Sequence, residues 1–230
     1  MSVKTLLALD FSTSFRTVAL MEIGTRKLLA CSSKSTTPVP TSTAGAEGIH
    51  FIINELLESA GLTQENVQML SLGMGPGSYN GVRSTIALAQ GWSLSVDIKL
   101  AAVSTLDALS FQANRLGWIG RHHILVDAQR NEYYHAIYQA VDIYTLPSAL
   151  GPVQILPKES LLPLFDENKN VGGPDLSESF PGIHPLYPMA EDIGLISLLQ
   201  NNFIRPENLS PVYLRPTQFA KAKPYRTLPI

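Results

Sequence analysis

The sequence has 230 residues, of which 45% are hydrophobic and 16% are charged, and its formal net charge at pH 7 is −2. This composition predicts a folded chain with a substantial core and excludes a disordered chain, and the charge offers no overall attraction to nucleic acid. The single cysteine, Cys31, excludes an internal disulfide and any site built from paired cysteines, and it indicates a reducing compartment.

The N-terminal half alternates short apolar runs with longer periodic segments. The first apolar run ends at Asp10, which makes it too short for a signal peptide, and no run is long enough to span a membrane, so we expect a cytoplasmic protein. Strands are expected at 5–9, 16–23, 27–33, 68–72 and 100–103. Apolar residues at helical spacing predict an amphipathic helix over 47–60, and small residues suggest a second over 82–95. Helices between the later strands indicate an α/β fold.

A second cycle of elements follows in the C-terminal half. A helix is expected over 104–115, with Ser104 as its N-cap, and a last amphipathic helix over 191–201. Short strands are expected at 124–126, 132–139 and near 170–173. We place a lobe boundary near residue 105, which divides the chain into lobes 1–105 and 106–230.

Residues 72–83, LGMGPGSYNGVR, join a predicted strand to a predicted helix, which is where phosphate-binding loops occur. A Walker loop needs a lysine, and this segment has none, whereas a dinucleotide fingerprint needs a third glycine where Asn80 stands. Pro76 also removes one backbone N–H donor. We therefore interpret the glycines as positions for a tight turn and for close packing of helix on strand.

As a whole, residues 73–83 resemble the G-x-GPGS-[FY]-x-G-[LV]-R signature of the TsaB (YeaZ) family. Four further stretches resemble that family in the same order, namely LALDFST at 7–13, VSTL at 103–106, DAQRNEYY at 127–134 and PVYLR at 211–215. The resemblance therefore covers nearly the whole chain.

The resemblance implies an ASKHA (actin/sugar-kinase/Hsp70-like) α/β fold of two lobes, with the second lobe reduced. TsaB proteins are non-catalytic paralogues of TsaD, which transfers a threonylcarbamoyl group to adenosine 37 of ANN-decoding tRNAs. TsaB pairs with TsaD, and the ATPase TsaE joins them. The resemblance thus implies an accessory subunit rather than an enzyme, which meets tRNA through the complex.

The residues of the metal and phosphate sites agree with a non-catalytic role. TsaD holds its metal on a His-x-x-x-His helix, and the five histidines here include no pair at that spacing, so no metal is expected. Asp10, Ser12 and Thr13 keep the outline of the first phosphate loop and are expected to be vestigial nucleotide contacts. Bulky residues at 127–130 replace the glycines of the second loop, although 171–174 could be a remnant of adenosine-binding glycines. We expect no cofactor of its own, and any ATP or ADP at an interface shared between subunits.

In the TsaB family the two N-terminal helices form a bundle with the same helices of TsaD. The resemblance therefore predicts a partner interface made by Glu47, Ile49, Ile52, Ile53, Leu56, Val82, Arg83, Ile86 and Ala89. Which helix face points inward stays open at this stage, and Arg83 also suits a structural hydrogen bond. The same surface is expected to form a homodimer when TsaD is absent.

The last 22 residues, 209–230, lack acidic residues. The basic residues of this segment are candidate contacts to tRNA phosphates within the complex, namely Arg215, Lys221, Lys223 and Arg226.

Two other functions are the alternatives: a kinase that shares the fold, and a metalloprotease, which is an old label of relatives. A small-molecule kinase of the ASKHA type would require an intact second phosphate loop and a catalytic acid. A metalloprotease would require paired histidines with an acid. The bulky residues at 127–130 argue against the kinase, and the histidine spacing argues against the metalloprotease.

Overall fold

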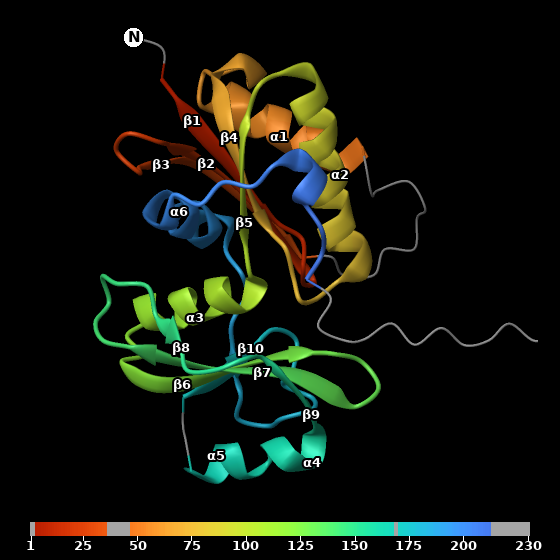
Figure 1. Ribbon diagram of the computed structural model, residues 1–230, viewed down its shortest axis with the longest axis vertical. Coiled ribbons are helices and arrows are strands. Elements are labelled where there is room, and N and C mark those ends of the chain that lie inside the picture. The colour runs from red at the N-terminus through yellow and green to blue at the C-terminus, as the bar shows by residue number, and fades with distance from the viewer. Residues whose placement is uncertain (1–2, 36–46, 168–169, 213–230) are drawn as a thin grey trace, which may run out of the picture.

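In the computed structural model, two β-sheets lie in separate lobes, and each sheet carries helices on both of its faces (Figure 1). The structure describes residues 3–35, 47–167 and 170–212. Within these residues, no helix is long and apolar enough to cross a membrane.

The sheet of the first lobe has five strands in the order β3-β2-β1-β4-β5. They are β1 (Thr5–Asp10), β2 (Phe15–Glu22), β3 (Leu28–Ser35), β4 (Val67–Gly73) and β5 (Lys99–Val103). The first three strands form an antiparallel meander, and β4 and β5 run parallel to β1. All six residues of β1 are buried because β1 lies at the centre of the sheet and helices cover both of its faces.

Helices from both halves of the chain cover the first sheet. On one face lie α1 (Glu47–Ser59) and α2 (Tyr79–Ser95), with the 3-10 turns η1 (Gln64–Asn66) and η2 (Pro206–Asn208) beside them. On the other face lies α6 (Ala190–Gln200), the last α-helix of the described chain. Residue 105 separates the two sheets, but α6 and the described segment that follows it return to the first lobe.

The second lobe is built on β6 (Gly120–Asp127) and β7 (Glu132–Ala140), an antiparallel hairpin. Short strands extend it in the order β11-β10-β6-β7-β8, and β9 also pairs with β7. They are β8 (Ser148–Ala149), β9 (Gln154–Pro157), β10 (Val171–Gly173) and β11 (His184–Pro185). The helix α3 (Thr105–Arg115) packs on the face toward the first lobe, and the short helices α4 (Lys158–Leu161) and α5 (Pro163–Glu167) lie beyond the other face (Figure 1).

The two-lobed α/β fold expected from the sequence is therefore confirmed, as are its main helices and strands. The hydroxyl of Ser104 accepts the N–H of Leu106 at 3.2 Å and caps α3, as predicted. The helix α2 begins at Tyr79, earlier than expected, because the Ser78 hydroxyl accepts the N–H of Gly81 and acts as the N-cap.

Candidate functional site

The glycine-rich segment between β4 and α2 packs tightly on the residues that follow β1. A Cβ added to Gly81 would lie 1.7 Å from the carbonyl oxygen of Phe11. A Cβ added to Gly77 would lie 2.1 Å from the carbonyl oxygen of Ser12. That same carbonyl accepts the N–H of Ser78 at 2.6 Å, so this amide points into the protein. The glycines allow two backbone segments to touch, in agreement with the packing interpretation.

Asp10 ends β1 and is fully buried beneath this loop. Its carboxylate accepts the N–H and the hydroxyl of Ser12 at 2.8 and 2.6 Å, and the Thr105 hydroxyl lies 3.5 Å away. Burial raises the pKa of Asp10 to about 6, and these hydrogen bonds oppose the rise. The Asp10 carboxylate thus orders the loop that follows β1, and its contact with a nucleotide stays a prediction.

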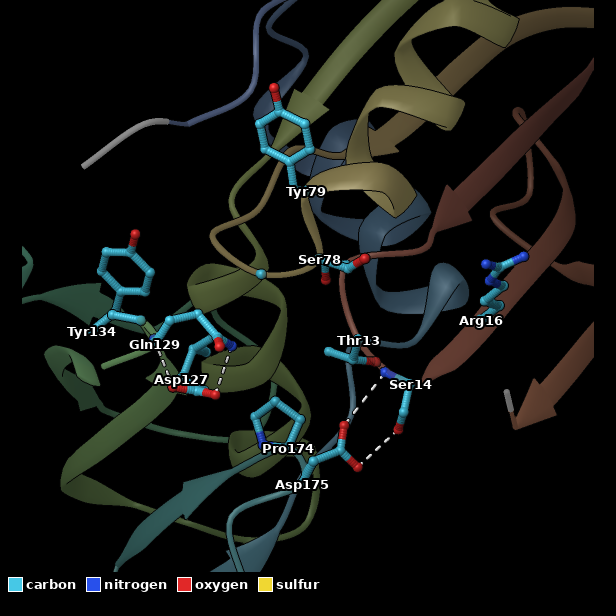
Figure 2. A pocket seen from close by; sticks show the side chains of 14 residues that line it. Thr13, Ser14, Arg16, Ser78, Tyr79, Asp127, Gln129, Tyr134, Pro174 and Asp175 are labelled. Atoms are coloured by element: carbon cyan, nitrogen blue, oxygen red, sulfur yellow. Dashed lines mark hydrogen bonds between the residues drawn. The ribbon is translucent and has the colours of Figure 1, made fainter. Parts of the chain in front are cut away.

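A cleft of about 490 Å³ opens between the two lobes, beside the loop that follows β1 (Figure 2). The predicted contacts Ser12 and Thr13 both line this cleft. Other lining side chains come from the loop after β1, the start of α2, the β6–β7 turn and the turn after β10, and they include Ser14, Arg16, Ser78, Tyr79, Asp127, Gln129, Tyr134 and Asp175.

The β6–β7 turn fills its side of the cleft with side chains. Gln129, Arg130 and Asn131 all have left-handed backbone angles, with φ of 65°, 62° and 60°. Gln129 donates its backbone N–H and its side-chain amide to the Asp127 carboxylate, at 2.7 and 2.9 Å. Asp127, an exposed acid of the cleft, is therefore engaged by its own turn (Figure 2).

The turn after β10 brings a second carboxylate to the cleft. Asp175 accepts the Ser14 hydroxyl at 2.8 Å and the Ser14 N–H at 3.3 Å (Figure 2). A Cβ on Gly173 would lie 2.1 Å from the carbonyl oxygen of Leu125, so this glycine allows β10 to approach β6. The glycines at 171–174 are visible in the sequence, but Asp175 has no local signal there, because its partner Ser14 is 161 residues away in the chain.

The charges that line the cleft do not favour a polyphosphate. Asp127 and Asp175 contribute two carboxylates and Arg16 contributes one cation. The Arg16 guanidinium also lies 5.3 Å from the centre of the Phe11 ring. A site for nucleotide phosphates is usually lined by backbone N–H groups and cations, and this lining is acidic overall.

The predicted partner residues of α1 and α2 are mostly core residues. Seven of them pack against the first sheet and are at most 9% exposed, namely Ile49, Ile52, Ile53, Leu56, Val82, Ile86 and Ala89. Their contact with a partner stays a prediction, and in this chain the apolar stripe that identifies the helix is covered by its own sheet. Glu47 begins α1, and its side chain lies outside the described residues.

The outward face of α1 and α2 carries a different set of residues. Phe51 is 59% exposed, and a groove of about 400 Å³ runs along α2. The residues that line this groove are His50, Gln64, Glu65, Ala87, Leu88, Gly91, Trp92, Ser95 and Val96. Arg83 is exposed on the first turns of α2, where its guanidinium lies 3.5 Å from the centre of the Tyr79 ring.

Two histidines of the second sheet pair with each other. Nδ1 of His123 lies 2.9 Å from Nε2 of His135, and the two rings are stacked. Burial lowers the pKa of both, that of His135 to about 4. Across the described residues, no three His, Cys, Asp or Glu side chains are placed to share a metal ion. The predicted tRNA contacts Arg215, Lys221, Lys223 and Arg226 lie outside the described residues.

Comparison with known proteins gives one consistent set of matches. A family model described as TsaD, tRNA N6-adenosine threonylcarbamoyltransferase, matches residues 27–171. The tRNA threonylcarbamoyladenosine biosynthesis protein TsaB of Haemophilus influenzae is 26% identical, over 92% of this chain and 93% of that protein. The TsaB protein of Escherichia coli is 28% identical, over 71% of this chain and 78% of that protein. The solved structure of YeaZ from Pseudomonas aeruginosa superposes with a TM-score of 0.73 at 27% identity, over 92% of this chain and all of the YeaZ chain.

Proposed function

This chain belongs to the family that the TsaD model describes and, within it, to the TsaB (YeaZ) proteins, and we propose that it acts in tRNA threonylcarbamoyladenosine biosynthesis as a non-catalytic partner of TsaD. TsaD would carry the metal and the transfer chemistry for adenosine 37 of ANN-decoding tRNAs. TsaE would complete the complex, and tRNA would meet this chain through the complex.

The state of the interlobe cleft carries the non-catalytic part of the proposal. A general base must be within reach of a substrate proton and free to accept it. Here Asp127 is engaged by Gln129, Asp175 is engaged by Ser14, and Asp10 is buried. The glycines that would open a backbone cradle are used for packing on Phe11 and Ser12. We therefore assign any ATP or ADP of the complex to an interface shared with TsaD and TsaE.

The outward face of α1 and α2 supports the partner role. Exposed apolar side chains next to a groove are typical of protein contact surfaces. Phe51 offers a large aromatic side chain, and the small residues Ala87 and Gly91 allow another helix to come close to α2. The family resemblance implies that TsaD presents its own pair of helices here. The same face would support a homodimer of the isolated chain.

Light scattering after size-exclusion chromatography tests this proposal directly. The chain mixed with TsaD of the same organism should elute with the mass of a complex. Phe51→Asp and Ala87→Asp should abolish that species, because each places a charge in the proposed contact without touching the core. Leu116→Asp is the matched control, because Leu116 is 67% exposed and lies at the end of α3 in the other lobe. Binding that persists in both helix variants would overturn the assigned face.

Isolated helix-core variants cannot serve as this test. Aspartate at Ile53 or Ile86 would place a charge inside the core that these residues form with the first sheet, so a lost complex would report unfolding. Before binding is measured, Phe51→Asp, Ala87→Asp and Leu116→Asp should each show the circular dichroism spectrum and the melting temperature of the parent chain.

A further inference from the structure

A hydrogen-bonded contact bridges the two lobes at the mouth of the cleft. Ser14 lies in the first lobe, between β1 and β2, and Asp175 lies in the second, directly after β10. The carboxylate accepts both donors of Ser14, the hydroxyl at 2.8 Å and the backbone N–H at 3.3 Å. The Tyr187 hydroxyl donates to the same carboxylate at 3.0 Å. Three donors from two segments thus converge on one acid.

This set of donors is chemically an oxyanion site. A backbone N–H and two hydroxyls that point at one place bind a carboxylate or a phosphoryl oxygen equally well by geometry. The Ser14 loop is also the segment that the sequence analysis assigned to vestigial phosphate contacts. In this structure its donors are used by a side chain of the opposite lobe.

The contact differs from the others that hold the lobes together. At the start of α3, the Thr105 N–H donates to the carbonyl of Gly75 at 2.8 Å and the Thr105 hydroxyl donates to the Ser12 hydroxyl at 3.0 Å, and the side chains of Thr105 and Ser12 are buried. The contacts of Asp175, by contrast, are exposed to solvent. Exposed hydrogen bonds are individually weak, so such a contact can open while the buried side remains intact.

From this arrangement we propose that Asp175 is an interlobe latch, whose carboxylate fills the oxyanion site of Ser14 and Tyr187 and so keeps the cleft closed to phosphoryl groups. The latch explains why a loop with phosphate-binding residues lies beside an acidic cleft. It concerns the cleft and not the helix face, so it is separate from the proposed binding of TsaD.

Substitution of Asp175 by glycine is the sharpest perturbation. Asp175 has a φ of 56°, which glycine adopts without strain, so Asp175→Gly removes the carboxylate and leaves the turn intact. Glu178→Gln is the matched control, because Glu178 is an exposed acid of the same segment and its loss changes the net charge equally. Ser14→Ala removes one donor from the other side and completes a double-mutant cycle.

Two measurements on the full chain then test the latch. Spin labels at Leu94→Cys and Leu162→Cys, in a Cys31→Ser background, report the distance between the lobes by electron resonance. Asp175→Gly should lengthen and broaden that distribution, and Glu178→Gln should leave it unchanged. Hydrogen exchange in residues 12–15 should become about tenfold faster in Asp175→Gly, the factor expected when roughly one hydrogen bond is lost.

Calorimetric titration with pyrophosphate tests the anion site itself. We expect Asp175→Gly to bind pyrophosphate at least about tenfold more tightly than the parent chain, because the donors are released and a repelling charge is removed. The added Ser14→Ala should reduce that gain, because it removes one of the three donors. An unchanged distance distribution, or pyrophosphate binding that is equal in Asp175→Gly and the parent, would overturn the proposal. A double-mutant cycle in which the two substitutions are additive would also overturn it.

Discussion

Two glycines of the same helix should respond in opposite ways to the same substitution. In Gly81→Ala, the new Cβ would lie 1.7 Å from the carbonyl oxygen of Phe11, and because both sides of the contact are backbone, the start of α2 must move. Overpacking of this kind costs about 3 kcal/mol, the upper part of its usual range. Alanine returns about 1 kcal/mol of helix propensity, so the net loss is about 2 kcal/mol.

Gly91→Ala is the matched control, because a Cβ at Gly91 meets nothing within 4 Å. This substitution should stabilise the chain by about 0.5–1 kcal/mol through helix propensity alone. For a chain of this length, Gly81→Ala should lower the melting temperature by about 4–8 °C and Gly91→Ala should raise it by about 1–4 °C.

Thermal and urea unfolding of the isolated chain, followed by circular dichroism, measure both variants. A Gly81→Ala chain as stable as the parent would refute the packing role of the loop. If that stable variant instead lost the binding of a nucleotide, the loop would be a ligand cradle after all.

Three further substitutions test the buried polar groups. Burial holds the pKa of His135 at about 4 in the folded chain against 6.5 when unfolded, so the neutral form stabilises the fold above pH 6.5 and this stability is lost on acidification. Lowering the pH from 7.5 to 5 should therefore reduce the free energy of unfolding of the parent by about 2 kcal/mol more than that of His135→Gln. Equal pH dependence in urea unfolding would contradict the burial of the His123–His135 pair. Arg115→Met removes the cation that faces the buried Asp192 carboxylate, and burial raises the pKa of Asp192 to about 6. The free energy of unfolding should therefore fall by about 2 kcal/mol at pH 8 and by less at pH 5, where the carboxyl is protonated. A loss that grows on acidification would contradict this. Asn114→Ala removes an amide that donates to a backbone carbonyl at 2.7 Å, and it should cost about 1–3 kcal/mol with no pH dependence, whereas an unchanged melting temperature would contradict this contact.

Local patterns predicted most elements of the fold because they depend on neighbours in the chain. The periodicity of 47–60 identifies α1, and the Ser104 cap marks the start of α3. The short elements β8, β9, α4 and α5 were missed, because runs of two to five residues leave little periodic signal. The return of α6 to the first sheet has no local signal either, because it is decided by packing between distant segments.

In the candidate site, too, local features could be predicted from the sequence, whereas contacts between distant residues could not. Periodicity could identify the apolar stripe of α1, but both a sheet and a partner select apolar residues, so it could not tell which of them covers Ile53. Phe51 is an apolar residue of the same helix outside this stripe, and its 59% exposure marks the outward face of α1. The contact of Asp175 with Ser14 could not be predicted, since it joins two turns 161 residues apart.

Reconstituted threonylcarbamoyl transfer to tRNA tests the central claim most directly. Supplied with ATP and an activated threonylcarbamoyl donor, purified TsaD and TsaE should modify an ANN-decoding tRNA well only when this chain is added, and this chain alone with the same donor should produce no modified adenosine. Asp127→Asn, which alters an exposed acid of the cleft, should support the same rate as the parent chain. Transfer by this chain alone, or a rate that collapses in Asp127→Asn while the complex still forms, would contradict the account of a non-catalytic partner.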